Sequence, residues 1–290
     1  MNTLNIIGCG KVGKTLGRLW LEQNLIKVGD VVNRSLQSAE QAVSFLGQGR
    51  AVAGVYDMHP ADIYLLATPD DNIHEAARQL AECGIIRPKD AVFHCSGALS
   101  SSILSTLRQT GAVLASVHPV KSFTDPVGAL STFAGTFCAV EGDPQALAMI
   151  EKLFTDIGGQ TFPVDPDNKH IYHAATVFAC NYLTALLEIS RRCCLKAGID
   201  EKTAMHLLEP LVRGTIANVF KNGPVQALTG PIARGDTKLV GDQLTALSDW
   251  RPQTGELYRL FGKVALELAK EQRMLSRHEL DAMETLLGSK

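Results

Sequence analysis

Apolar and polar positions along the first half of the chain repeat one unit: a short apolar run, a turn, and then a stretch with helical spacing. This order predicts parallel strands joined by crossover helices. The apolar run ADIYLLAT at 61–68 is typical of a strand that is covered on both faces. The expected strands are 4–7, 27–33, 61–68, 91–96, 113–119 and 137–140, and the expected helices are 13–24, 38–46, 69–83 and 144–157.

The pattern changes after the turn residues at 166–168, where long helical periodicities without a clear strand begin. The sequence therefore predicts an α/β Rossmann domain, with a doubly wound parallel sheet, over 1–165 and an all-α domain over 166–290. The segment 170–194 is apolar nearly all round, so we expect it in the middle of a helical bundle. Further helices are expected at 201–221, 239–247 and 252–275.

A glycine motif lies between the first expected strand and helix. Gly8, Gly10 and Gly13 form G-x-G-x-x-G, and this context is the one that a dinucleotide site requires. Gly8 would make the tight turn, Gly10 would let the backbone approach a pyrophosphate, and Gly13 would let helix and strand pack closely. With Lys11 and Val12, the motif offers exposed N–H groups and the positive end of a helix dipole to phosphate. The alternative is a glycine-rich turn that binds nothing.

The end of the second expected strand indicates which dinucleotide is bound. An NAD site usually has Asp or Glu here, about 20 residues beyond the motif, to accept hydrogen bonds from the ribose. This chain has Asn33, Arg34 and Ser35 instead. No carboxylate repels a 2′-phosphate, and a guanidinium offers a planar fork of donors, so the sequence favours NADP. The alternative is that Arg34 is an ordinary exposed turn residue.

Candidate catalytic residues follow three other strands, because ligands of open parallel sheets lie beyond the carboxyl ends of the strands. Thr68 and Pro69 follow one strand and are expected beside the cofactor, Ser96 follows the next, and His118 lies at the end of the third. Hydride transfer needs a proton donor or acceptor with a pKa near neutrality, which suits His118, while Ser96 would orient the substrate oxygen. Alternatively, His118 only structures a His-Pro turn.

Candidate substrate contacts lie further along the chain. Lys121 and Ser122 would anchor a carboxylate. Lys169 and His173, at i and i+4 of the long helix, are expected to face a cleft or solvent, and His173 would take part in catalysis. Asn181 lies about 80° further round the helix, close enough to line the same cavity. The alternative is that His173 and Asn181 are satisfied polar groups of a bundle core.

A sharp turn is expected in the segment TGPIARGD at 229–236. It would present Arg234 to an acidic substrate or to a cofactor phosphate. The alternative is an Arg234–Asp236 pair that only ties down the loop. The eight histidines show no spacing typical of a metal site, so we predict no metal.

Charge and cysteine usage narrow the class of partner. The chain has 28 Lys and Arg against 30 Asp and Glu. It has no block of like charge that would bind nucleic acid or an anionic membrane. We therefore expect a small-molecule substrate. Seven cysteines without a C-x-x-C pair, no signal-peptide pattern at the start and no apolar run of about 20 residues predict a cytoplasmic protein that spans no membrane.

Several motifs together resemble one family. GCGKVG near the start, CSGAL at 95–99, VHPVKSF at 117–123, the helix segment 169–186 and GPIARGD at 230–236 are similar to two-domain Rossmann-like proteins whose C-terminal half is a domain of unknown function. The resemblance covers essentially the whole chain and implies an NADP-dependent oxidoreductase. The wider relatives are deazaflavin-dependent NADP reductases, pyrroline-5-carboxylate reductases and 3-hydroxyacid dehydrogenases. Dimerisation through the helical domain is common among them, so the resemblance also implies a homodimer.

The resemblance also bears on the chemistry. Prephenate dehydrogenases are similar in having a Ser after one strand and a catalytic His in a His-Pro turn after the next, as Ser96 and His118 are placed here. The Lys and Asn pair of 3-hydroxyacid dehydrogenases is not matched, because Val177 stands four residues after His173. We expect hydride transfer between NADP and a small carbonyl, hydroxy-acid or imine compound. The alternatives are a sensor that binds NADPH without turnover and a deazaflavin-linked reductase.

Overall fold

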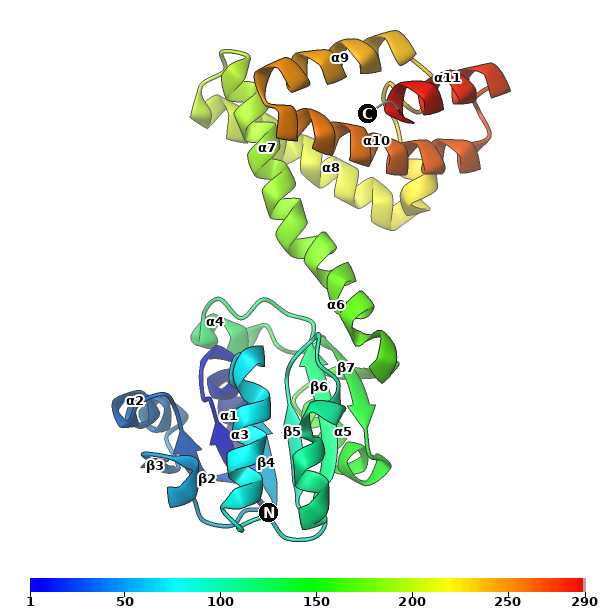
Figure 1. Ribbon diagram of the computed structural model, residues 1–290. Helices are drawn as coiled ribbons and strands as arrows, with labels where there is room; N and C mark the ends of the chain where they lie inside the picture. Colours follow the sequence, from blue (N-terminus) through cyan, green and yellow to red (C-terminus); the bar gives the residue numbers. More distant parts are fainter. Residues whose placement is uncertain (289–290) are drawn as a thin grey trace. The chain divides into compact units, whose positions relative to one another are not determined.

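The computed structural model describes residues 1–288, and the chain divides into two compact units, Met1–Cys180 and Asn181–Lys290. The first unit is built on an eight-stranded sheet (Figure 1). Its strands are β1 (Asn2–Ile7), β2 (Ile26–Val32), β3 (Arg50–Val52), β4 (Ile63–Leu66), β5 (Ala91–His94), β6 (Val113–Pro119), β7 (Phe137–Gly142) and β8 (Gln160–Pro163).

The sheet has the order β3-β2-β1-β4-β5-β6-β7-β8. All neighbours pair in parallel except β6 and β7, which are antiparallel. The predicted doubly wound α/β fold is confirmed, with one antiparallel pairing that the sequence pattern did not indicate. The six expected strands are present, whereas the two strands at the edges of the sheet, β3 and β8, were not predicted.

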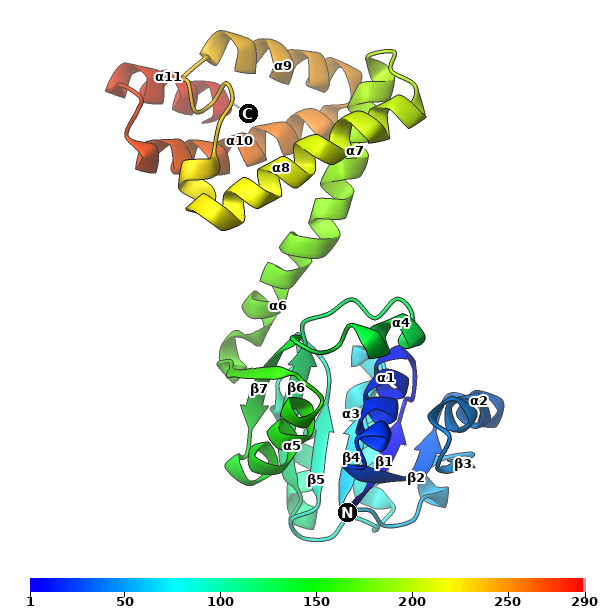
Figure 2. The same ribbon diagram turned by 180° about the vertical axis from the view of Figure 1, so that it is seen from behind.

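Helices cover both faces of the sheet (Figures 1 and 2). On one face, Trp20 of α1 (Lys11–Glu22), Phe93 of β5 and Phe154 of α5 (Pro144–Asp156) pack edge to face against one another. The Trp20 indole N–H donates to the carbonyl of Leu153 at 2.9 Å. The opposite face packs against α3 (Asp70–Glu82) and η2 (Ser101–Thr110). The helices of this unit are α1 (Lys11–Glu22), α2 (Leu36–Leu46), α3 (Asp70–Glu82), α4 (Pro126–Ser131), α5 (Pro144–Asp156) and α6 (Lys169–Val177), with 3₁₀ turns η1 (Val55–Asp57), η2 (Ser101–Thr110) and η3 (Pro166–Asn168).

The second unit is helical, as predicted, and has a small core. Its elements are α7 (Leu183–Lys196), α8 (Glu201–Ala227), α9 (Thr237–Trp250), α10 (Pro252–Gln272) and α11 (Arg277–Gly288). A π-helical turn, Phe178–Tyr182, joins α6 to α7. The buried apolar cluster consists of Val240, Leu266, Ala269, Met283 and Leu287. Of these helices only α11 was not expected. No helix within residues 1–288 is long and apolar enough to cross a membrane.

Two expectations differ from the structure. The division between the compact units falls after Cys180, not after residue 165, because α6 belongs to the first unit through the buried side chain of Lys169. The expectation that 170–194 lies in the middle of a bundle is wrong for the single chain. Ile171 and Phe178 are 72% and 60% exposed, so an apolar surface all round a helix did not mean burial here.

Candidate functional site

A cavity of about 630 Å³ opens at the carboxyl ends of β1, β2 and β4. Because β2 and β4 lie on either side of β1, this is the position at which the strand order reverses, where open α/β sheets bind ligands. Of the predicted cofactor residues, the cavity is lined by Gly8, Gly10, Asn33, Arg34, Thr68 and Pro69. Lining residues that were not predicted include Cys9, Lys14, Ser38, Gln41 and Asn72.

The glycines have the geometry that the motif requires. Gly8 has a φ of +84°, and a Cβ there would lie 2.6 Å from the backbone nitrogen of Thr68. A Cβ on Gly13 would lie 3.4 Å from the Ile6 side chain, where α1 packs on β1. Gly10 has open space, since its nearest neighbour would be the Gly8 carbonyl at 4.0 Å. A ligand can therefore approach the backbone closely at Gly10, as the second glycine of such a motif must allow.

Two polar features of this cavity lack partners within the described residues. Gly10 is the N-cap of α1 and supplies no side-chain acceptor to the first turn, which contains no acidic residue either. The hydroxyl of Thr68 is buried without a hydrogen-bond partner. Lys11, which is exposed, and Val12, which packs against the core, do not line the cavity. The arrangement suits an anionic ligand with further hydrogen-bonding groups.

The end of β2 offers donors and no carboxylate. The Asn33 amide donates to the Ser38 carbonyl at 2.8 Å, and the Ser35 hydroxyl caps α2 by accepting from the Ser38 N–H at 3.3 Å. Ser35 therefore acts on the helix and does not line the cavity. Arg34 is exposed and forms no ion pair within residues 1–288. The nearest acid on this strand, Asp30, is buried and already accepts two bonds from Arg50.

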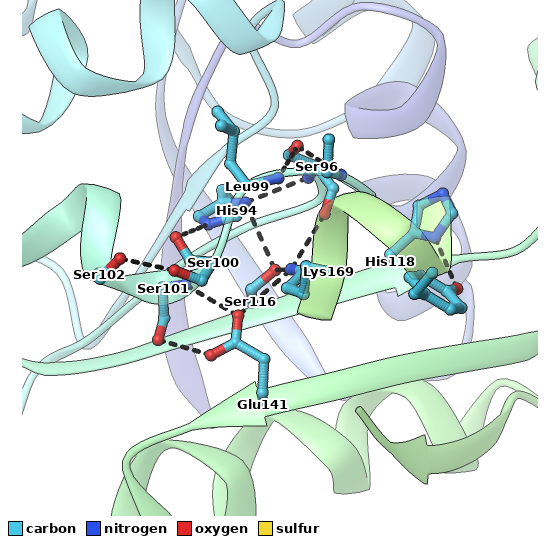
Figure 3. Close-up of polar contacts among 12 residues, drawn as sticks. His94, Ser96, Leu99, Ser100, Ser101, Ser102, Ser116, His118, Glu141 and Lys169 are labelled. Carbon is cyan, nitrogen blue, oxygen red and sulfur yellow. Dashed lines mark hydrogen bonds and ion pairs between the residues drawn. The ribbon is translucent and has the colours of Figure 1, made fainter. Parts of the chain in front are cut away.

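A second group of polar side chains crosses the sheet at β5, β6 and β7 (Figure 3). Strand register pairs His94 with Ser116 and Ser116 with Glu141, so the three side chains form one row on one face. Lys169, the first residue of α6, completes this row. We call His94, Ser116, Glu141 and Lys169 the buried polar cluster.

The Lys169 ammonium is the centre of the cluster. It donates to Glu141 at 3.2 Å, to the carbonyl of Ser96 at 3.3 Å and to the hydroxyl of Ser116. Glu141 in turn accepts from the backbone N–H and hydroxyl of Ser101 at 2.8 and 2.7 Å. Burial lowers the pKa of Lys169, and the Glu141 carboxylate opposes that change. The prediction that Lys169 faces a cleft and binds substrate is wrong: it is 1% exposed and all its donors have partners.

His94 is held neutral by its hydrogen bonds. Its Nδ1 accepts from the Ser96 N–H at 3.1 Å, so the proton is on Nε2, which donates to the Ser100 carbonyl at 3.2 Å. A second proton on Nδ1 would oppose the Ser96 N–H. Burial, reinforced by the Lys169 charge, lowers the pKa of His94 to about 3.

Ser96 is committed to shaping its own turn. Its hydroxyl donates to Asp70 at 2.8 Å and accepts from the N–H groups of Ala98 and Leu99 at 3.2 and 3.0 Å. These contacts hold the loop after β5 against the start of α3. In this arrangement Ser96 has no donor left for a substrate oxygen, so it positions Gly97 and its neighbours rather than orienting the substrate.

The imidazole rings of His118 and His173 lie close to each other and to Gly97. Their ring centroids are 5.5 Å apart, and a Cβ on Gly97 would lie 2.3 Å from Nδ1 of His173 and 2.9 Å from Nε2 of His118. His118 Nδ1 lies 2.9 Å from the Tyr172 hydroxyl. Burial, with the nearby His173 and Lys169, lowers the pKa of His118 to about 4, and burial raises the pKa of Tyr172 to about 12. The strand end therefore presents a neutral imidazole beside a glycine loop.

The remaining predicted residues are not gathered at this place. Lys121 donates to the Thr132 carbonyl at 2.9 Å, and Ser122 is exposed. Asn181 and Arg234 belong to the second unit. The alternative of an Arg234–Asp236 pair is not observed, since Asp236 caps α9 by accepting from the Leu239 N–H at 3.0 Å. In the part of the chain described, no three His, Cys, Asp or Glu side chains could hold a metal ion.

Sequence reasoning missed four residues of this region: His94, Ser116, Glu141 and Tyr172. Glu141 directly follows the apolar run 137–140 and precedes Gly-Asp-Pro, and Lys169 follows the polar turn residues 166–168, so neither position stood out as a buried charge. No signal singled out Tyr172, whose contact with His118 joins positions 54 residues apart.

The chain matches two family models, and several solved structures share its fold. A Rossmann-like domain matches residues 2–119, and a domain of unknown function, DUF2520, matches residues 136–265. Protein TM1727 from Thermotoga maritima is 28% identical with a TM-score of 0.73, over 93% of this chain and 99% of that one. An imine reductase from Myxococcus stipitatus in complex with NADP⁺ is 18% identical with a TM-score of 0.64, over 93% and 94%. A 1-pyrroline-5-carboxylate reductase from Streptococcus pyogenes is 17% identical with a TM-score of 0.59, over 93% and 98%.

These matches define the class of protein. It is a two-domain protein with a Rossmann-like N-terminal half. More specifically, this half is followed by a region that matches the DUF2520 domain model, which agrees with the family that the sequence motifs resemble. No curated protein sequence matches the chain.

Proposed function

We propose that the protein is an NADP-dependent oxidoreductase that transfers a hydride between nicotinamide and a small carbonyl, hydroxy-acid or imine compound. The observation that carries the proposal is the cavity at β1 and β4, which is lined by the Gly8–Gly10 turn, with a Gly10 N-cap that supplies no side-chain acceptor to α1, and by Thr68 and Pro69. The fold is shared with an imine reductase and a pyrroline-5-carboxylate reductase, and the first of these was solved with NADP⁺.

The residues of the cavity fit a dinucleotide. The turn at Gly8 and Gly10 would hold the pyrophosphate, and Thr68 with Pro69 would lie along the path towards the nicotinamide. Arg34, with Asn33 beside it, would receive the adenosine 2′-phosphate. Bound in this way, the cofactor supplies or accepts the hydride.

His118 is the residue that we assign to proton exchange at the substrate, and His173 would lie beside it as a second polar contact. The Gly97 backbone between the two rings leaves no side chain in the way. Ser96 and the buried polar cluster hold this loop in place through the Ser96 carbonyl and hydroxyl. Ser122, Asn181 and Arg234 stay candidate substrate contacts.

Cofactor titration and a turnover assay test the proposal. We expect the purified protein to bind NADPH more tightly than NADH in a fluorescence titration, and to oxidise NADPH with at least one member of a panel of 2-oxo acids, aldehydes and cyclic imines. Failure to bind either nucleotide at millimolar concentration would refute the proposal. Tight binding without turnover would instead favour a redox sensor.

We also propose a homodimer formed through the helical unit. Within that unit, an apolar cavity of about 770 Å³ is lined by α7, α9 and α10 and includes the exposed side chains of Leu257, Phe261 and Val264. Sedimentation velocity should give a dimer, and Phe261→Asp should shift the protein towards monomer. A monomeric wild type at micromolar concentration would contradict this assignment.

A further inference from the structure

The pair formed by His118 and Tyr172 connects the end of β6 to α6. The tyrosine hydroxyl lies 2.9 Å from Nδ1 of the histidine, and the two rings meet edge to face at 82°. Both side chains are half-buried. Within residues 1–288, this is the hydrogen bond that the Tyr172 hydroxyl forms. The contact therefore decides how the imidazole is protonated.

The direction of the hydrogen bond follows from the chemistry of the two groups. A neutral imidazole has one N–H and one nitrogen lone pair. A phenol O–H is a good donor, and an imidazole nitrogen is a better acceptor than a phenol oxygen. Tyr172 therefore donates to Nδ1 of His118, and the imidazole proton is on Nε2. That nitrogen is the ring atom near Gly97, at the carboxyl end of β5.

We propose that Tyr172 and His118 form a proton relay, in which Nε2 of His118 gives its proton to a substrate carbonyl oxygen while Nδ1 takes the proton of Tyr172. This inference rests on the proposed function. It also selects the substrate class: a carbonyl needs a proton on oxygen during reduction, whereas a preformed iminium ion does not. The substrate class is therefore aldehydes and ketones.

The step balances. The hydride adds to the carbonyl carbon, so the nicotinamide is oxidised and the carbonyl is reduced, and the C=O π pair becomes a lone pair on oxygen. That oxygen bonds to the Nε2 proton, Nδ1 takes the Tyr172 proton, and the imidazole stays neutral. The tyrosinate that remains is reprotonated from solvent. Without Tyr172, release of the Nε2 proton would leave an imidazolate, which is a much stronger base than a phenolate.

The surroundings favour a neutral histidine and an intact phenol at rest. Lys169 and His173 from α6 face His118, and Cys138 from β7 lies near Tyr172. The pKa of His118 is lowered to about 4 and that of Tyr172 is raised to about 12. A relay with these groups would work at constant rate through neutral pH, while an imidazolium acid at His118, with a pKa of about 4, would already be deprotonated at neutral pH.

The sign of one pKa change tests the direction of the hydrogen bond without any substrate. In ¹⁵N-labelled protein, an NMR titration should show Nδ1 of His118 unprotonated at pH 7. In Tyr172→Phe, the pKa of His118 should rise by at least one unit, because the neutral ring loses its donor. If the ring donated to Tyr172 instead, the same substitution would lower the pKa, and that result would overturn the relay. Tyr258→Phe, which removes a comparable bond to Gln243, is the matched control.

Kinetics test the relay itself. With 2-oxo acids and aldehydes, Tyr172→Phe should reduce kcat at least tenfold and make it fall between pH 5 and 7, with NADPH affinity unchanged. Equal kcat and equal pH profiles in the two proteins would overturn the relay, as would turnover of iminium compounds only. A wild type that binds no NADPH, or turns over no compound of the panel, would refute the proposed function itself.

Discussion

The cofactor cavity and the buried polar cluster lie on the same sheet and differ in how far their polar groups are satisfied. In the cavity, the Thr68 hydroxyl lacks a partner and Arg34 has no ion pair within the described residues. In the cluster, Lys169 has three partners and Glu141 has two additional donors from Ser101. An exposed group such as the Arg34 guanidinium is available to a ligand, whereas satisfied buried groups fix the backbone.

Substitutions in the two regions should have different effects. Changes in the cluster should reduce stability first, because each leaves a buried charge or donor without a partner. Changes in the cavity should reduce ligand binding and leave folding largely intact. His118 is a member of neither region: Lys169 contributes to its lowered pKa, and its Nε2 is near the Gly97 loop.

The largest effect is expected for Lys169→Met. Removing the ammonium leaves Glu141 buried without its cation, which costs about 3–5 kcal/mol in the free energy of unfolding. Chemical denaturation at pH 7 measures this. The double variant Lys169→Met/Glu141→Gln should regain part of the loss, because the amide removes the unpaired charge and its oxygen still accepts from Ser101. Lys238→Met, which breaks an exposed pair with Asp242, serves as control and should change little. A single variant as stable as the wild type would show that the cluster does not hold the fold.

The second effect is a loss of stability at acidic pH. The pKa of His94 is about 3 in the folded protein against an ordinary value of 6.5, so between these values the unfolded chain binds a proton that the folded chain does not. Stability from this group is complete above pH 6.5 and falls as the pH falls, by up to about 1.4 kcal/mol per pH unit. His118, with a lowered pKa, acts in the same direction. The free energy of unfolding, measured by denaturation at several pH values, should depend less on pH in His94→Asn than in the wild type. An unchanged pH dependence would contradict a neutral, buried His94.

The sequence predicted much of the first region and little of the second. Gly8, Gly10 and Gly13 could be found because a phosphate turn imposes local spacing on neighbouring residues. The cluster depends on strand register: Ser116 meets Glu141 only because β7 runs antiparallel to β6, and nothing local in the sequence encodes that pairing. Lys169 was therefore assigned to a cleft.

A similar limit applies to the catalytic residues. His118 could be placed at a strand end from the apolar pattern alone. Its neighbour Tyr172 could not, because the contact depends on how α6 meets β6 and β8, and the helix pattern alone gives no preference among its polar positions. Ser96 was placed correctly at the end of a strand, but its partners Asp70, Ala98 and Leu99 could be known only from the folded turn.

The third effect is expected at the glycine turn. Gly8→Ala puts a Cβ 2.6 Å from the Thr68 nitrogen and forces alanine to a φ of +84°. We expect NADPH affinity to fall at least tenfold in a fluorescence titration, because the turn must move away from the cavity. Gly84→Ala is the matched control, with a φ of +69° and no atom near the added Cβ. The control carries the backbone strain alone, so it should lose a little stability and keep its affinity. Equal affinities in both variants would remove the turn from the binding site.

The smallest effect distinguishes the two nucleotides at the exposed end of the cavity. Arg34→Gln removes the guanidinium but keeps a polar side chain, and exposed charge pairs contribute only about 0.2–1 kcal/mol. NADPH affinity should therefore fall by about fivefold at most, with NADH affinity unchanged, because only NADPH has the 2′-phosphate. Arg213→Gln, an exposed arginine of α8, should change neither. An equal loss for both nucleotides would place Arg34 at the shared pyrophosphate, and no loss for either would make it an ordinary surface residue. The outcome also decides whether the missing carboxylate at the end of β2, rather than any added contact, is what favours NADPH.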